Sequence, residues 1–214
     1  MEKQHHKVFY LGLIGFIAVA VSVMLHASYI ASFDQLGQDW AQSLEPFHKI
    51  LQAATLIAEP KFDLVYVAII AVIIFAFFKR YRLYASCLFF AIIVGDAIGT
   101  VTKRLIHRPR PIGHLKVDDG FSFPSGHVLG MGIICLWLIM ILLPVLVKNV
   151  TLRLIADILI WIFLLLVMIS RVYFLAHYPS DVLGALFLSM TMIGIAKFSL
   201  TMIKHDHHRT KRTN

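Results

Sequence analysis

Three short segments of the sequence combine basic, hydroxyl and imidazole side chains at spacings that could bind an anion and transfer a group. They contain Lys103 and Arg110, then Ser125, Gly126 and His127, then Arg171, His177 and Asp181. Basic side chains can hold an anion, a histidine can attack or carry a proton, and a carboxylate can orient the histidine. We therefore treat these residues as candidates for one site.

The third segment, SRVYFLAHYPSD, spaces a histidine and an acid so that they can touch. Pro179 suits the first turn of a helix, so His177 would lie just before that helix and Asp181 in its opening turn. A carboxylate that accepts from one ring nitrogen fixes the tautomer and leaves the other nitrogen free to attack. A pair of this kind on its own is more often an interfacial hydrogen bond, so it gains weight only beside the other two segments.

The second segment, FPSGHVLGMG, places a polar turn at the start of an apolar stretch. Pro124 and Ser125 mark the start of a helix, and Gly126 lets backbone N–H groups approach a ligand without a side chain in the way. A helix N-terminus favours anions, and we interpret the anion as a phosphate. His127 on the first turn is placed to give a proton to a departing oxygen. Taken alone, Ser125 could be only a helix cap and His127 only an interfacial histidine.

The first segment, TKRLIHRPRPIGHLK, is strongly basic. If the preceding helix extends far enough before Pro109 and Pro111 end it, Lys103 and Arg110 project from one face, and two cations converge on one anion. For any single arginine of this segment, contact with lipid phosphates is the alternative. The neighbouring Arg108-Pro109 repeats the Arg-Pro pair, so Arg110 is one of two candidate arginines.

The elements that must position these segments are membrane helices. Hydrophobic residues make up 59% of the 214-residue chain, charged residues only 15%, and the mean hydropathy is +0.79. Stretches of about 20 apolar residues, the length that crosses a bilayer, occur at about 8–25, 62–78, 83–102, 126–147, 152–169 and 182–203. We expect an all-α fold, a six-helix transmembrane bundle forming one domain over residues 1–204, followed by a basic tail, 205–214, that is disordered.

Lysines and arginines in short loops indicate the orientation, because they favour the cytoplasm. They precede the first span and follow the second, the fourth and the sixth, which predicts that both termini are cytoplasmic and that the three candidate segments meet at the outer face. The connection 28–61 repeats large apolar residues at helical spacing, with Ser32 and Gln35 as a capping box, so we expect a short interfacial amphipathic helix there. A packing lid over the bundle is an equal alternative.

Together the segments resemble the type 2 phosphatidic acid phosphatase superfamily. The resemblance rests on Lys103 with six residues before Arg110-Pro111, on Pro124-Ser125-Gly126-His127, and on Ser170-Arg171 with five residues before His177 and three more before Asp181. Within that superfamily the chain is most similar to small bacterial phosphatidylglycerophosphatase B and undecaprenyl-diphosphate phosphatase members.

The resemblance implies a cell-membrane enzyme that dephosphorylates membrane lipid phosphates without a metal or other cofactor: phosphatidylglycerophosphate, undecaprenyl diphosphate or phosphatidic acid. It implies that His177 attacks phosphorus, Asp181 orients it, and His127 protonates the leaving alcohol. Lys103, Arg110 and Arg171, with Ser125 and the Gly126 N–H, would hold the phosphate oxygens. We interpret Asp118 and Asp119 as a solvated loop rather than a magnesium site. The expected partners are the lipid substrate and membrane lipids, with no nucleic acid. The alternative is a protein that binds or transports anionic lipid headgroups without catalysis.

Overall fold

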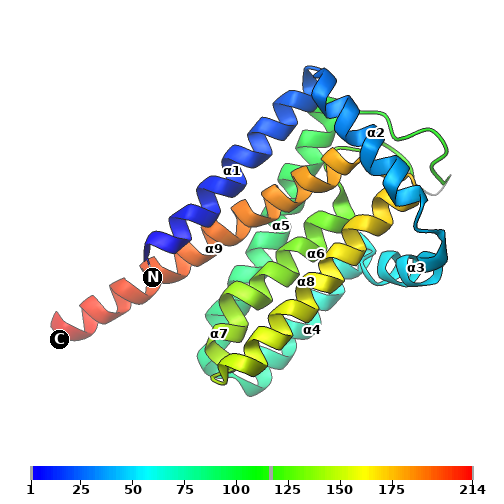
Figure 1. Cartoon of the computed structure of the whole chain (residues 1–214). Coiled ribbons are helices and arrows are strands. Elements are labelled where there is room, and N and C mark those ends of the chain that lie inside the picture. The colour runs from blue at the N-terminus through cyan, green and yellow to red at the C-terminus, as the bar shows by residue number, and fades with distance from the viewer. Residues whose placement is uncertain (1, 116–117, 214) are drawn as a thin grey trace.

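The structure is a computed structural model that describes the backbone of residues 2–115 and 118–213, and the side chains of residues 6–79, 81–115 and 118–203. Every regular element in this part of the chain is a helix, which confirms the all-α prediction (Figure 1). The α-helices are α1 (Glu2–Met24), α2 (Ser28–Gln42), α3 (His48–Ile57), α4 (Pro60–Phe77), α5 (Arg82–Ile106), α6 (Gly126–Trp137), α7 (Leu143–Leu146), α8 (Val150–Tyr173) and α9 (Pro179–Thr213). A π-helical turn, Leu138–Leu142, joins α6 to α7.

Six helical stretches are long and apolar enough to cross a membrane, as predicted. They are His6–Met24, Pro60–Phe77, Arg82–Ile106, Gly126–Leu146, Val150–Tyr173 and Pro179–Ile203. Helix α6 lies at the centre of the bundle, where it packs against α4, α5, α8 and α9, and all its residues from Val128 to Trp137 are buried. The candidate segment at residues 124–127 therefore begins the most enclosed helix of the protein.

Helices α1 and α9 run side by side along one flank of the bundle (Figure 1). Their backbones approach closely, because a Cβ built on Gly12 would lie 2.6 Å from the Thr191 nitrogen and one on Gly194 would lie 2.7 Å from Phe9 Cα. Small residues at such crossings are the usual basis of helix packing in membranes. This contact anchors α9, whose first turn carries Asp181.

The connection between the first two spans forms two helices instead of the single one predicted. Helix α2 begins at Ser28 after Ala27, and a 3₁₀ turn at Glu45–Phe47 separates it from α3. The proposed capping box is wrong: Ser32 lies inside α2, and its hydroxyl donates to the Ser28 carbonyl at 3.2 Å. Both helices lie at the end of the bundle opposite the chain termini (Figure 1).

Two other expectations about helix ends are wrong. Helix α5 stops at Ile106 because His107 adopts the left-handed conformation with φ of 51°, so Arg110 belongs to the following loop and does not share a helix face with Lys103. The tail predicted to be disordered is helical as far as Thr213, since α9 continues through it. The side chains of the tail lie outside the described residues.

Candidate active site

The three predicted segments meet at one cavity, at the end of the bundle that α2 covers. The cavity has a volume of about 430 Å³, and five of the predicted residues line it: Lys103, Arg110, Gly126, His127 and His177. Thr100 and Asp96 of α5 and the aspartates of the 118–119 loop complete much of its wall. Two histidines and two cations far apart in the sequence therefore share one cavity.

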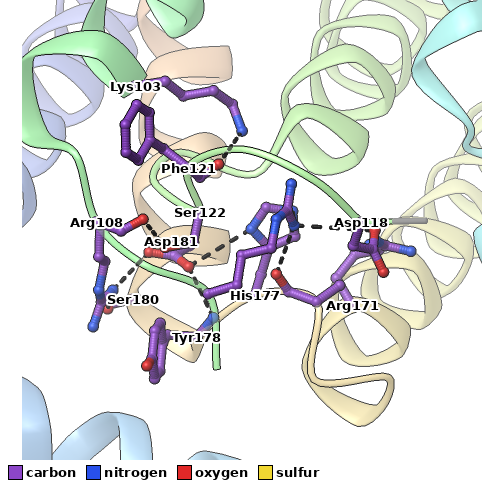
Figure 2. Close-up of polar contacts among 12 residues, drawn as sticks. Lys103, Arg108, Asp118, Phe121, Ser122, Arg171, His177, Tyr178, Ser180 and Asp181 are labelled. Carbon is purple, nitrogen blue, oxygen red and sulfur yellow. Dashed lines mark hydrogen bonds and ion pairs between the residues drawn. The ribbon is translucent and has the colours of Figure 1, made fainter. Parts of the chain in front are cut away.

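Asp181 lies beside His177, as the spacing predicted. Pro179 begins α9, and the Asp181 carboxylate accepts from the Tyr178 backbone N–H through Oδ2 at 2.9 Å. The same Oδ2 is 3.6 Å from Nδ1 of His177, which is longer than a hydrogen bond but within ion-pair range (Figure 2). Asp181 is fully buried and His177 is 2% exposed, so both side chains are largely shielded from bulk water.

The other ring nitrogen of His177 faces Arg110. Nη1 of Arg110 is 3.3 Å from Nε2 of His177 and donates to the Ala176 carbonyl at 2.8 Å. A guanidinium can only donate, so this contact assigns the lone pair to Nε2 and the proton to Nδ1, the nitrogen nearest Asp181. Burial lowers the pKa of His177 to about 4, and Arg171 and Arg110 act in the same direction, against the opposing effect of Asp181. His177 is therefore neutral at pH 7, and its Nε2 lone pair lies on the cavity side beside Arg110.

The cations around the cavity are held by the loop between α5 and α6. Lys103 Nζ donates to the Phe121 carbonyl at 2.9 Å, and Arg110 donates to the Asp119 carbonyl from Nε at 3.0 Å and from Nη2 at 2.7 Å. Burial lowers the pKa of the Arg110 guanidinium, although the charges of the nearby aspartates raise it in part. The loop therefore holds Arg110 in position, whereas the prediction relied on a helix that continued from Lys103 to Arg110.

Arg171 contacts an acid that the sequence interpretation had placed in solvent. Its Nη2 lies 2.6 Å from Oδ1 of Asp118, whose side chain is only 13% exposed. The interpretation of Asp118 as a solvated loop residue is therefore wrong. A phosphate that binds Arg171 must share it with this carboxylate or displace it.

Ser125 and Arg171 do not line this cavity, but each has a buried donor that could serve a phosphate oxygen. Ser125 precedes α6 and its hydroxyl is buried, while Arg171 Nε is buried beside its paired Nη2; neither atom has a hydrogen-bond partner among the described residues. A buried donor without a partner costs about 1–3 kcal/mol, so an acceptor oxygen from a ligand would be favourable at both. A Cβ on Gly126 would meet only Pro60 at 3.6 Å, an ordinary contact. Protein packing thus does not require glycine here, and the missing side chain leaves the backbone N–H open to a ligand.

His127 belongs to two adjoining cavities. Besides the first, it lines a second of about 350 Å³, formed by α3, the start of α4 and the end of α8, with Gln52, Thr55, Glu59 and Lys61 among its polar residues. A ligand could therefore extend from the first cavity into the second, and the bond between its two parts would lie beside the His127 ring. This position suits an acid that protonates a leaving group.

Three acidic or basic residues at this end of the bundle received no role from the sequence. Arg108, noted only as a competitor of Arg110, does not line the cavity and pairs with Asp181 from the side away from His177. Asp34 of α2 is buried and pairs with Arg108. Asp63 in the first turn of α4 is also buried, and a Cβ on Gly130 would lie 1.6 Å from its Oδ2. Acids within membrane spans are functional candidates by default, a signal that could have identified Asp63.

Metal ligation does not emerge from this geometry. Among the residues whose side chains are described, no group of three or more histidines, cysteines, aspartates or glutamates is arranged to hold a metal ion. The positive charge at the cavity comes from lysine and arginine side chains.

A six-span helical bundle that gathers two histidines and three cations at one end suits a membrane protein that binds an anion and transfers a group. The family model of the PAP2 superfamily matches residues 84–203, more than half of the chain and all three segments, so the chain belongs to the PAP2 superfamily. It is a lipid phosphate phosphatase, which confirms the predicted enzyme over a non-catalytic binding protein.

Two solved structures share the fold. The transmembrane PAP2-type phosphatidylglycerolphosphate phosphatase from Bacillus subtilis is 23% identical with a TM-score of 0.76, over 90% of this chain and 95% of that one. LpxE from Aquifex aeolicus is 17% identical with a TM-score of 0.55, over 76% of this chain and 92% of that one. Among curated proteins, none matches the chain.

Proposed function

We propose that the protein removes the terminal phosphate of a membrane lipid, with phosphatidylglycerophosphate as the first candidate, through a phosphohistidine on His177 and without a metal. The observation that carries this proposal is the placement of His177, with Nδ1 toward Asp181 and the unprotonated Nε2 on the cavity beside Arg110. This arrangement suits a nucleophile, because an unprotonated Nε2 can attack phosphorus but cannot donate to a phosphate oxygen.

In the first step, Nε2 of His177 forms a bond to phosphorus while the bond from phosphorus to the lipid oxygen breaks. His127, protonated once the phosphate anion is bound beside it, gives its proton to that oxygen, and Nδ1–H of His177 turns its developing positive charge toward Asp181. In the second step, neutral His127 takes a proton from water, the water oxygen bonds to phosphorus, and the bond to Nε2 breaks. Inorganic phosphate leaves, and both histidines return to their starting states.

Three fixed cations suit the charge of the transferred group. A phosphate monoester carries about −1.5 to −2 at neutral pH, and transfer concentrates charge on its equatorial oxygens. Lys103, Arg110 and Arg171, with the Ser125 hydroxyl and the Gly126 N–H, supply donors for those oxygens. Protein groups thereby do what magnesium does in many phosphoryl-transfer enzymes.

The cavities support an amphiphilic substrate. The first and second cavities share Pro60, Asp118 and His127, and the second adjoins an apolar groove through the consecutive residues Leu56 and Ile57. The groove, of about 460 Å³, lies between α4 and α8 over α6. A phosphate in the first cavity, a polar headgroup in the second and an acyl chain in the groove would match a phospholipid. The fold shared with a phosphatidylglycerolphosphate phosphatase supports that headgroup as the first to test.

Trapping the covalent intermediate tests the proposal. The enzyme in detergent should form an acid-labile, base-stable phosphoenzyme from labelled lipid phosphate, and His177→Ala should abolish both the label and turnover. Activity should persist in excess chelator and be blocked by vanadate, which copies the five-coordinate transition state. Full loss of activity in chelator that magnesium restores, or a fully active His177→Ala variant, would exclude this mechanism.

Orientation completes the proposal: both termini face the cytoplasm and the site faces outward. The basic residues of the α4–α5 and α7–α8 connections support it, as does the position of both termini at the end of the bundle away from α2 (Figure 1). A cysteine at Ile112, which is 98% exposed beside the site, should react with an impermeant thiol reagent outside intact cells, and one at the exposed Lys79 should not. Reversed labelling would overturn the orientation.

A further inference from the structure

An ion-pair chain runs from α2 to the acid that orients His177. Arg108 donates from Nη1 to Asp181 Oδ1 at 2.6 Å and to the Ser180 hydroxyl at 2.7 Å (Figure 2). Its other terminal nitrogen, Nη2, pairs with Oδ2 of Asp34 at 2.5 Å. One guanidinium therefore bridges two buried carboxylates from separate helices, α2 and α9.

Asp34 is built into the start of α9. It is 3% exposed and accepts from the Ser180 backbone N–H at 2.8 Å and from the Ser180 hydroxyl at 2.9 Å. One turn further along the same face of α2, a Cβ on Gly37 would lie 2.5 Å from Pro179 Cγ, so α2 rests directly on the first turn of α9. The position of Asp34 is thus coupled to that of the turn that carries Asp181.

The remaining contacts of Arg108 restrict its orientation further. Its Cζ lies 4.0 Å from the centre of the Tyr178 ring, and its backbone carbonyl accepts from the Ser122 N–H at 2.9 Å. Arg108 does not line the phosphate cavity, where Arg110 stands instead. Two arginines two residues apart therefore face different partners: Arg110 faces the nucleophile, and Arg108 faces the acid behind it.

We propose that Arg108 and Asp34 are positioning residues for phosphoryl transfer: Asp34 holds Arg108, and Arg108 holds Oδ1 of Asp181 so that Oδ2 faces Nδ1 of His177. This inference rests on the proposed function, because it assigns the pair a role in aiming the nucleophile. It also assigns α2 a role beyond covering the bundle, since α2 carries Asp34, the first residue of the ion-pair chain.

Arg108 is the side chain best placed to set the rotation of the Asp181 carboxylate. Oδ2 is shared between the Tyr178 N–H at 2.9 Å and His177 at 3.6 Å, whereas Oδ1 is bound by Arg108 at 2.6 Å. Without that bond the carboxylate can turn toward Tyr178 and leave the imidazole free to rotate. Misplacing a reacting group by about 1 Å can cost about 10²-fold in rate, so we expect a loss of that order in kcat.

The test compares Arg108→Gln, Arg108→Lys and Asp34→Asn with two matched controls, Arg104→Gln on α5 and Asp39→Asn on α2, whose side chains are exposed. Arg108→Gln should lower kcat about 10²-fold and Asp34→Asn about 10-fold, with KM and vanadate inhibition changed by less than about threefold. The double variant should lose no more than Arg108→Gln alone, because both changes break one chain. The controls should keep wild-type kinetics.

The pH profile of kcat/KM separates positioning from simple stabilisation. His177 faces Asp181 through Nδ1 and Arg110 through Nε2, the charge of Arg171 also acts on it, and His127 shares its cavity. Asp181 in turn faces Arg108. Removing the Arg108 charge leaves more of the Asp181 charge to favour imidazolium, so the acid limb should move to higher pH in Arg108→Gln. Arg108→Lys should return the acid limb of the pH profile to its wild-type position and restore part of kcat. One substrate is used throughout, so its own titration cancels between variants.

Several outcomes overturn the inference. A raised KM and weaker vanadate inhibition, with the acid limb unmoved, would make Arg108 a phosphate ligand. If Arg108→Gln keeps a normal kcat per folded molecule, the ion pairs of Asp34, Arg108 and Asp181 have only a structural role. If Arg108→Gln does not fold, Asp34→Asn and Gly37→Ala, which pushes α2 off Pro179, carry the same test. A wild-type enzyme that forms no phosphohistidine would refute the proposed function instead, which keeps the two failures distinct.

Discussion

Replacing Asp181 by asparagine should reverse the tautomer of His177 while keeping the shape of the site. Arg108 Nη1 lies 2.6 Å from Oδ1 of Asp181, and because arginine only donates, the amide oxygen of the asparagine must take that position. The amide NH₂ then occupies the place of Oδ2, facing both the Tyr178 N–H and Nδ1 of His177. A donor facing Nδ1 favours the tautomer protonated on Nε2, which cannot attack phosphorus.

The geometry sets the size of the effect. The attacking tautomer would place two donors face to face, the new NH₂ and Nδ1–H of His177, whereas the NH₂ faces the Tyr178 N–H in either tautomer and that contact does not distinguish them. Each unmatched buried donor costs about 1–3 kcal/mol, which gives about 2–6 kcal/mol in all. At about 1.36 kcal/mol per factor of ten, kcat should fall by roughly 30-fold to 2 × 10⁴-fold. The same substitution in a serine-protease triad costs about 10⁴-fold, near the upper end of this range.

The assay is phosphate release from detergent-solubilised lipid phosphate, with phosphoenzyme formation followed in a rapid quench. Asp181→Asn should slow formation of the phosphoenzyme with little change in KM, and its helical circular dichroism should match the wild type. Asp39→Asn, the same chemical change at an exposed position of α2, is the control. Near-normal turnover of Asp181→Asn in folded protein would refute the orienting role of Asp181.

Four further predictions follow from the site. His127→Ala should lose turnover of lipid phosphates by about 10²–10⁴-fold yet keep much of its activity on nitrophenyl phosphate, whose leaving group needs no proton; equal losses on both would contradict its role as acid. Since the pKa of His177 lies at about 4, below its ordinary value, its loss of nucleophilicity should appear only as pH falls through about 4, and a limb traced to this residue near pH 6.5 would contradict the burial argument. Asp118→Asn removes the carboxylate that pairs with Arg171 at 2.6 Å, so Arg171 becomes available and vanadate should bind several-fold more tightly. Weaker vanadate binding would show instead that Asp118 supports the site. Ile160→Trp in the apolar groove should lower kcat/KM about tenfold for a long-chain lipid and leave nitrophenyl phosphate unaffected, whereas Leu154→Trp on the exposed part of α8 should change neither; equal effects of the two would argue against an acyl chain in the groove.

The sequence by itself predicted the membrane bundle and five of the residues that line the first cavity. Six spans could be read directly, because a bilayer requires about 20 consecutive apolar residues whatever the surrounding fold. The contact of His177 with Asp181 was also accessible, since one helical turn beginning at Pro179 brings residues four apart together. These are short-range properties, and neighbouring residues alone determine them.

The tertiary structure decided which arginine does what. Arg108 and Arg110 sit in the same local pattern, and only the reversal of the chain at His107, with the loop held by Ser122, turns one to the cavity and the other to Asp181. No local pattern could pair Asp34 with Ser180, 146 positions further along the chain. That contact exists because α2 folds back across the end of the bundle and Gly37 lets it rest on Pro179. Long-range packing of this kind depends on the whole arrangement of helices, and so the support behind the nucleophile emerges only from the folded protein.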